Sequence, residues 1–187
     1  MMGAMLHASV LIYLSFMNSR AFISGRALSN LGMPRSPYAH ILNVYGFIIP
    51  GIMLLVFSLG AYSVFGLEGR LGALGLAFGA ASFSMAGLLP FPNASHFAAV
   101  MGACAFLALG IALLAIPIAR TLRWPSFQWA SYTVVLLVVG NLDLPLLFGV
   151  HPGYYQLLSI SACMAWLLCV SGALFLSANP PWRRAEA

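Results

Sequence analysis

The sequence predicts an all-α, polytopic membrane protein built as a bundle of six transmembrane helices in a single domain, residues 1–187. Hydrophobic residues make up 62% of the chain and charged residues only 6%, whereas soluble domains carry about 25% charged residues. Eight basic and three acidic side chains are too few to cover a water-exposed surface. Hydrocarbon must therefore contact most of the exterior.

The apolar residues fall into runs close to the roughly 20 residues that span a bilayer as a helix. We expect helices at residues 2–17, 41–65, 71–89, 97–119, 128–148 and 155–177. The first is the weakest, because it is short. The second contains Pro50-Gly51 near its middle, where proline should kink the helix. Bundles tolerate such a kink when a neighbour satisfies the carbonyl that the proline frees. The third carries Gly75-x-x-x-Gly79, a spacing that allows close helix approach. We interpret it as an internal packing face, with a homodimer seam as the alternative.

The distribution of arginine predicts the orientation. With six helices, the side that holds both termini collects five arginines (Arg70, Arg120, Arg123, Arg183 and Arg184), against three in the first connection (Arg20, Arg26 and Arg35). Both termini are therefore expected in the cytoplasm. The first connection and the turns at 90–96 and 149–154 then share the outer face. Because the arginines lie in short loops and at helix ends, the net charge of +5 does not predict nucleic-acid binding.

Asp143 is the only acidic residue inside an apolar segment. A carboxylate in mid-helix costs about 2.5–3.5 kcal/mol, so it must face the bundle, be paired or be protonated. It lies roughly 9 Å below the outer surface, judged by the rise of a helix. Two interpretations stay open: a proton-relay or substrate-binding carboxylate next to Asn141, or a structural hydrogen bond or ion pair.

Three histidines, His40, His96 and His151, begin a helix or lie in a turn on the outer face. Three imidazoles at one depth are weak candidates for a transition-metal site, and interfacial contact with water or headgroups is the plainer interpretation. A haem clamp would need two facing histidines deeper in the bundle, and His7 is expected near the opposite side. No cofactor is therefore expected, with haem or metal as the alternative.

One short turn holds the highest density of candidate functional residues: Leu89-Pro90-Phe91-Pro92-Asn93-Ala94-Ser95-His96. Asn93 or Ser95 can cap the fourth helix by accepting a free backbone N–H. The open start of that helix, with His96 in its first turn, is alternatively an anion site for a headgroup. The cysteines, Cys104, Cys163 and Cys169, lie inside apolar runs and are expected to be packing residues.

Ser29-Asn30-Leu31-Gly32 with Pro34, Asn43-Val44-Tyr45-Gly46, and Leu89-Pro90-Phe91-Pro92 with His96 resemble the motifs of a bacterial and archaeal membrane family, domain of unknown function 998. The family resembles this chain in a Ser-x-Leu-Gly stretch after helix one, an Asn and a Gly opening helix two, a Phe-Pro turn and a following His. Asn93 stands where the family has an acidic residue, and Gly149-Val150-His151-Pro152-Gly153 replaces a Glu-Arg pair.

This resemblance implies six helices and a prokaryotic inner or plasma membrane, but no reaction. Three functional hypotheses follow. The first is a membrane protein that binds a lipid, a membrane partner protein or a second copy of itself. The second is a membrane-embedded enzyme or carrier that uses Asp143, His96 and His151 on a lipid-like or small substrate. The third is a haem or metal redox subunit. The candidate ligand-binding residues are Arg35, His40, Asn43, Asn93, His96, Asn141 and Asp143.

Overall fold

The computed structural model describes the backbone of residues 1–18, 28–148 and 152–178, and the side chains of residues 1–18, 29–140 and 157–176. These residues form helices, turns and no strand, which confirms the all-α prediction. The order is α1 (Met2–Met17), a 3₁₀ turn η1 (Leu28–Gly32), a π-helical segment η2 (Ile41–Ile48) continued by α3 (Ile49–Val64), α4 (Leu67–Leu88), α5 (Ala94–Thr121), α6 (Phe127–Phe148) and α7 (Pro152–Ala178).

Six helices thus stand where six were predicted, with η2 and α3 as one continuous helix. Within the described residues, four stretches are long and apolar enough to cross a membrane: Ile41–Val64, Leu67–Leu88, Ala94–Thr121 and Leu157–Leu176. The protein is therefore an integral membrane protein. The largest difference in bounds is at the start of α4, predicted at residue 71 and observed at Leu67. Glu68 lies in this first turn, where the helix dipole favours a negative charge.

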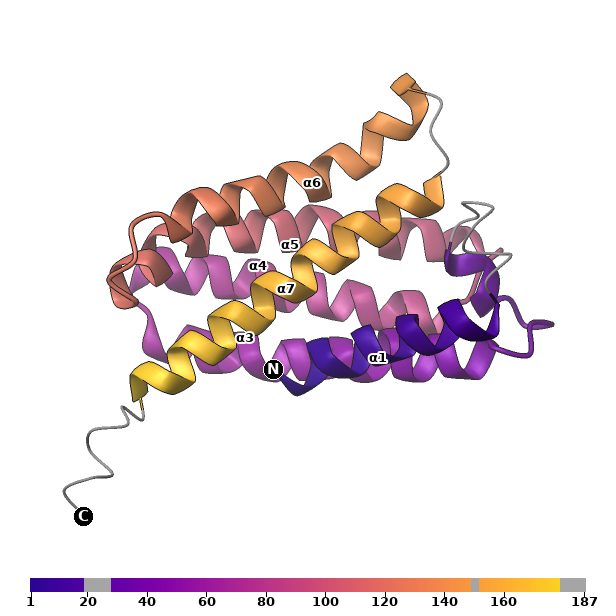
Figure 1. Ribbon diagram of the computed structural model, residues 1–187, viewed down its shortest axis with the longest axis horizontal. Coiled ribbons are helices and arrows are strands. Elements are labelled where there is room, and N and C mark those ends of the chain that lie inside the picture. The colour runs from indigo at the N-terminus through magenta and orange to yellow at the C-terminus, as the bar shows by residue number, and fades with distance from the viewer. Residues whose placement is uncertain (19–27, 149–151, 179–187) are drawn as a thin grey trace, which may run out of the picture.

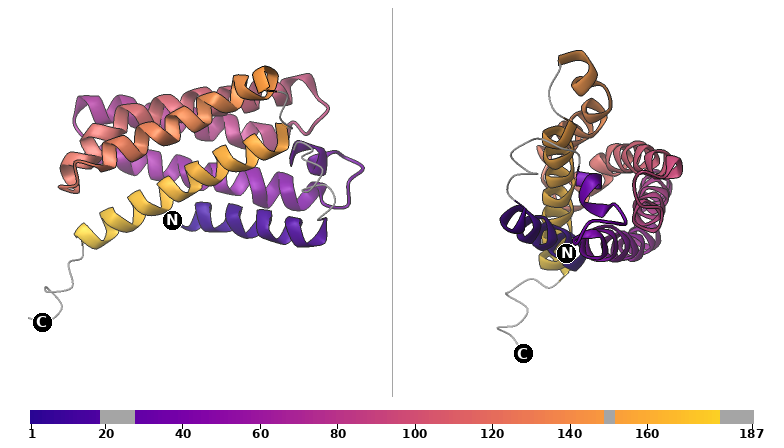
Figure 2. Two further views of the ribbon diagram at one scale, coloured as in Figure 1. Left: turned by 45° about the horizontal axis from the view of Figure 1, so that its top comes forward. Right: turned by 90° about the vertical axis from the view of Figure 1, so that its right-hand side faces the viewer.

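The helices run back and forth along the long axis of the bundle, and α7 crosses the others at an angle (Figures 1 and 2). The end at the right of Figure 1 collects the end of α1, η1, the start of η2 and the turn between α4 and α5. The first connection and the turn at 90–96 therefore lie at one end, as predicted, insofar as they are described. Helix α1 begins partway along the bundle rather than at its far end (Figure 1).

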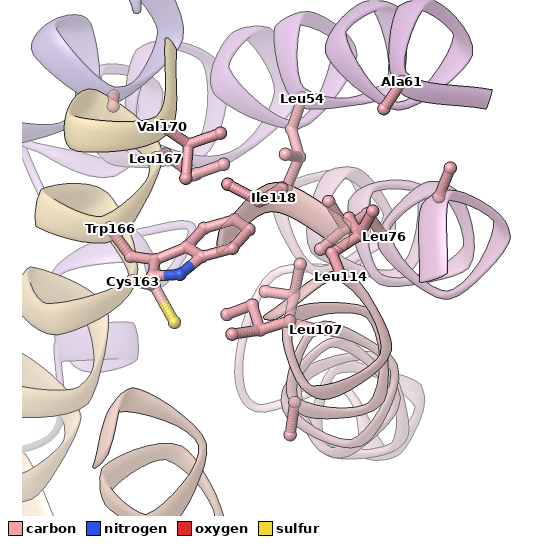
Figure 3. Packing of buried hydrophobic residues seen from close by; sticks show 14 of the residues in the cluster. Leu54, Ala61, Leu76, Leu107, Leu114, Ile118, Cys163, Trp166, Leu167 and Val170 are labelled. Atoms are coloured by element: carbon pink, nitrogen blue, oxygen red, sulfur yellow. The ribbon is translucent and has the colours of Figure 1, made fainter. Parts of the chain in front are cut away.

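The core joins α7 to the α3–α4–α5 layer through apolar side chains. Leu167 and Val170 of α7 lie close to Leu54, Leu114 and Ile118 in one packed cluster (Figure 3). A polar link fastens α7 to α6 within this cluster. The indole Nε1 of Trp166 donates to Ser131 Oγ at 2.8 Å, and Ser131 Oγ donates to the Phe127 carbonyl at 2.9 Å. The Trp166 indole and the Ser131 hydroxyl thus each donate to an acceptor, as hydrocarbon surroundings require.

The glycine-rich face of α4 packs against α5 inside the bundle. A Cβ placed on Gly75 would lie 2.9 Å from Gly110 Cα, and one on Gly110 would lie 2.6 Å from the backbone nitrogen of Leu76. Only glycine allows two backbones to approach this closely. The prediction that Gly75 and Gly79 form an internal packing face is therefore confirmed.

We expect Gly75→Ala to destabilise the protein, by about 1–3 kcal/mol, because its methyl group meets backbone atoms that cannot move aside independently. Gly60→Ala is the matched control, since a Cβ there meets nothing within 4 Å and alanine favours the helix over glycine by roughly 1 kcal/mol. Thermal unfolding of the purified protein in detergent measures both. Equal melting temperatures for the two variants would contradict the packing described here.

Candidate functional site

A hydrogen bond between Asn43 and Gly32 fastens η1 to the start of η2. The Asn43 Nδ2 donates to the Gly32 carbonyl at 2.9 Å, and a Cβ on Gly32 would lie only 2.5 Å from Asn43 Oδ1. Asparagine and glycine at these positions therefore fit together as a clasp. The sequence predicted that Asn43 binds a ligand. In the structure its side chain makes this structural contact.

The start of α5 is held by Asn93 and His96. Asn93 Oδ1 accepts the backbone N–H of Ser95 at 2.9 Å, which confirms the predicted cap. His96 is 4% exposed, and its Nδ1 lies 2.9 Å from both the Ala86 and Leu89 carbonyl oxygens. Since carbonyls only accept, Nδ1 carries the hydrogen. His96 therefore joins the last carbonyls of α4 to the first turn of α5 and lies inside the bundle, not at the interface as the plainer interpretation had it.

His7 of α1 performs a similar task at the proline in the second helix. Pro50 has no amide hydrogen, so it cannot bond the carbonyl four residues earlier, that of Gly46. His7 Nδ1 donates to this Gly46 carbonyl, from a side chain that is 1% exposed. The expectation that a neighbour satisfies the freed carbonyl is confirmed. The backbone around Gly46 is π-helical, the form often found where a helix departs from its regular bonding.

This contact shows that the expectation of His7 near the opposite side was wrong. The reason is that α1 is short: His7 is only about three turns from its C-terminal end at Met17, roughly 15 Å at 1.5 Å per residue. His7 and His96 thus flank one ring, each with its centroid 6.4 Å from that of Phe47. Sequence reasoning missed this pair, and the available signal was a proline four residues after Gly46 with a lone histidine in a facing apolar helix.

The two imidazoles share a second property. His7 Nε2 and His96 Nε2 are buried and have no hydrogen-bond partner in the described structure. With hydrogen on Nδ1, each Nε2 is a bare acceptor. A buried acceptor without a donor lowers the stability of a protein by about 1–3 kcal/mol. Because most buried polar atoms in proteins are hydrogen-bonded, two unpaired nitrogens call for an explanation.

The predicted cluster of outer histidines is not assembled among the described residues. His40 is exposed on the bundle and packs edge-on against Tyr45, with ring centroids 6.0 Å apart, whereas His96 is buried. No three histidine, cysteine or acidic side chains in the described part of the chain lie together as metal ligands. His151 lies outside the described residues.

The remaining nominated residues stay predictions. Asn141 and Asp143 belong to the last third of α6, and their side chains lie outside the described set. Arg35 is exposed in the turn before η2. A catalytic role for Asp143, and its pairing with an arginine or histidine, is therefore neither supported nor contradicted.

The feature best suited to a ligand among the described residues is a half-open apolar cavity of about 390 Å³. Helices α1, α3, α4, α5 and α7 line it, and most of its wall is aliphatic or aromatic. Four lining residues, Met1, Met2, Ile52 and Val56, are exposed on the bundle surface and form its mouth. The lining consists of Met1, Met2, Gly3, Ala4, Pro50, Ile52, Met53, Leu54, Val56, Phe57, Leu76, Phe83, Leu107, Ile111, Cys163, Met164, Leu167 and Ser171.

Ser171 is the only lining residue with a hydroxyl or amide in its side chain. Its Oγ accepts a hydrogen bond from the Met1 N-terminal ammonium at 3.2 Å. Apart from this pair, the cavity offers shape and apolar contact. No apolar periodicity along one helix indicates such a cavity, because five helices contribute to it.

A family model described as a protein of unknown function, DUF998, matches residues 1–173 of the chain. No curated protein and no solved structure matches it.

We predict that His7 and Pro50 are energetically coupled. His7→Leu should destabilise the protein by about 1 kcal/mol, because the Gly46 carbonyl then loses its donor. In a Pro50→Ala background the amide of residue 50 can bond that carbonyl, so the same His7→Leu change should cost less. A double-mutant cycle on unfolding in detergent measures the difference. Strictly additive effects would show that the proline does not create the need for His7.

Proposed function

Because the chain belongs to the DUF998 family, whose description assigns no reaction, we propose from its own geometry that it is an integral membrane protein that binds the aliphatic chain of a lipid in the cavity between α1, α3, α4, α5 and α7. The observation that carries this proposal is the cavity of about 390 Å³ with its apolar lining. Ligand pockets in proteins fall at about 300–1,000 Å³.

Energetics favour an occupied cavity. Atoms that line an empty space lose the van der Waals contacts that a filled space would give them, so an unfilled cavity is unfavourable. A chain that enters from the bilayer leaves surroundings as apolar as the cavity wall, so van der Waals contact with the wall, rather than transfer out of water, stabilises its binding.

The position of the mouth supports a ligand that arrives from the bilayer. Ile52 and Val56 are 52% and 65% exposed and lie near the middle of the 24-residue span Ile41–Val64. At 1.5 Å per residue they are at least roughly 12 Å from either end of that helix. The opening therefore faces the hydrocarbon core, and a chain can enter sideways without crossing water.

For orientation, we propose that both termini face the cytoplasm of a prokaryotic inner or plasma membrane. Arg70, Arg120 and Arg123 belong to the α3–α4 and α5–α6 connections or the adjoining helix ends, opposite the end that holds η1. This grouping agrees with the excess of arginine on cytoplasmic loops.

A cavity-filling substitution tests the proposal. Cys163 is buried, lines the cavity and lies beside Trp166 (Figure 3), so Cys163→Phe should occupy part of the space and lower labelling by a diazirine-bearing hexadecane at least about tenfold, the factor that 1.4 kcal/mol produces. Protein in phosphatidylcholine vesicles is irradiated, and labelled peptides are quantified by mass spectrometry.

Cys169→Phe is the matched control, since Cys169 is on the same helix but exposed. We expect labelling of the lining residues to be unchanged in this variant. Equal labelling of the wild type and Cys163→Phe, or a wild type labelled only on its outer surface, would show that no chain occupies the cavity.

A further inference from the structure

We propose that the ligand of this cavity is an uncharged, single-chain lipid that ends in a hydroxyl group, such as a long-chain or isoprenoid alcohol, and that its hydroxyl donates a hydrogen bond to Nε2 of His7. This inference rests on the proposed function and narrows the class of lipid. Three observations carry it: the depth of the mouth, a lining without charged side chains and the unpaired nitrogen behind the cavity wall.

The depth of the mouth selects against charged headgroups. Because Ile52 and Val56 open the cavity near the middle of a membrane span, a ligand that enters there is dissolved in the hydrocarbon core. A charged group at that depth is costly, and the one charged group among the lining residues, the Met1 ammonium, already donates to Ser171 Oγ. A hydroxyl is polar enough to be recognised and still compatible with entry from the bilayer.

The tautomer of His7 selects a hydrogen-bond donor. Its Nδ1 hydrogen is used by the Gly46 carbonyl, so Nε2 presents a lone pair. This atom is buried and has no partner in the described structure. An ether, a ketone or a hydrocarbon has no hydrogen to give, whereas an alcohol has one. Binding an alcohol would therefore remove the cost of a buried unpaired acceptor.

His7 lies directly behind one wall of the cavity. Phe83 lines the cavity, and its ring packs edge-on against His7, with centroids 5.6 Å apart. Gly3 and Ala4 also line the cavity, one turn before His7 on the same buried face of α1. His7 itself does not line the cavity, so the proposed hydrogen bond requires the Phe83 ring to turn aside and let the hydroxyl pass.

His96 supplies the matched comparison. It has the same buried, unpaired Nε2 and the same Nδ1-to-carbonyl contact. However, its ring contacts Phe47 and Phe91, neither of which lines the cavity. A general effect of buried histidines would appear at both positions, whereas the proposed site involves His7 alone.

The experiment is competition against the diazirine-bearing hexadecane in phosphatidylcholine vesicles, with 1-hexadecanol, hexadecyl methyl ether and hexadecanoate as competitors. The wild type should be half-displaced by hexadecanol at about one tenth of the ether concentration. His7→Asn should abolish this preference, because the Asn amide can replace the Nδ1 hydrogen toward Gly46 but has no counterpart of Nε2. His96→Asn should retain it. Phe83→Trp should weaken it, by obstructing the route to His7.

Each other result contradicts the inference. Equal displacement by alcohol and ether, or loss of the preference in His96→Asn but not in His7→Asn, would show that His7 Nε2 does not bind the hydroxyl. Tighter binding of hexadecanoate would place a charged headgroup near Met1 and Ser171 instead. If hexadecane itself fails to label the cavity of the wild type, the proposed function and this inference fall together. If it labels and only the alcohol preference is missing, the proposed function stands.

Discussion

The carbonyl of Gly46 is the point on which the arrangement of the bundle depends. In hydrocarbon a backbone oxygen without a donor is expensive, and Pro50 leaves this one without the amide that a regular helix would provide. His7 supplies the hydrogen. To do so, α1 must lie against η2 and α3 at a fixed height, so this buried hydrogen bond helps to set the position of a short helix along the bundle.

The same constraint shapes the cavity. Pro50 lines it, as do Gly3 and Ala4 from the turn before His7. Gly3 lets α1 approach α3 closely, since a Cβ there would lie 2.7 Å from Met53 Cβ, and α7 closes the cavity from the other side with Cys163, Met164 and Leu167. Meanwhile α4 and α5 are pressed together by Gly75 and Gly110, so they form a rigid wall opposite. The backbones of α4 and α5 are therefore in close contact, whereas the space between these helices and α1, α3 and α7 contains the cavity.

Much of this fold can be predicted from the sequence, because helix number and bounds follow from apolar length, and Asn93 and the Gly75–Gly79 face are local signals. The position of His7 cannot be predicted from local signals, since it depends on the height at which α1 packs against η2. The pairing of His7 and His96 around Phe47 joins residues from three separate helices. The sequence predicted His40 as a site residue because it was expected among polar residues at the outer face. The structure instead shows His7 and His96 bonded to backbone carbonyls inside the bundle.

The tautomer of His7 is the most direct test of the account. Solid-state NMR of protein labelled with ¹⁵N-histidine and ¹³C-glycine in lipid bilayers, with His7→Asn to assign the signals, reports which nitrogen carries hydrogen. The account predicts a protonated Nδ1 that is close in space to the Gly46 carbonyl carbon, and an Nε2 that is unprotonated. Hydrogen on Nε2, or a His7 ring with no contact to Gly46, would contradict it.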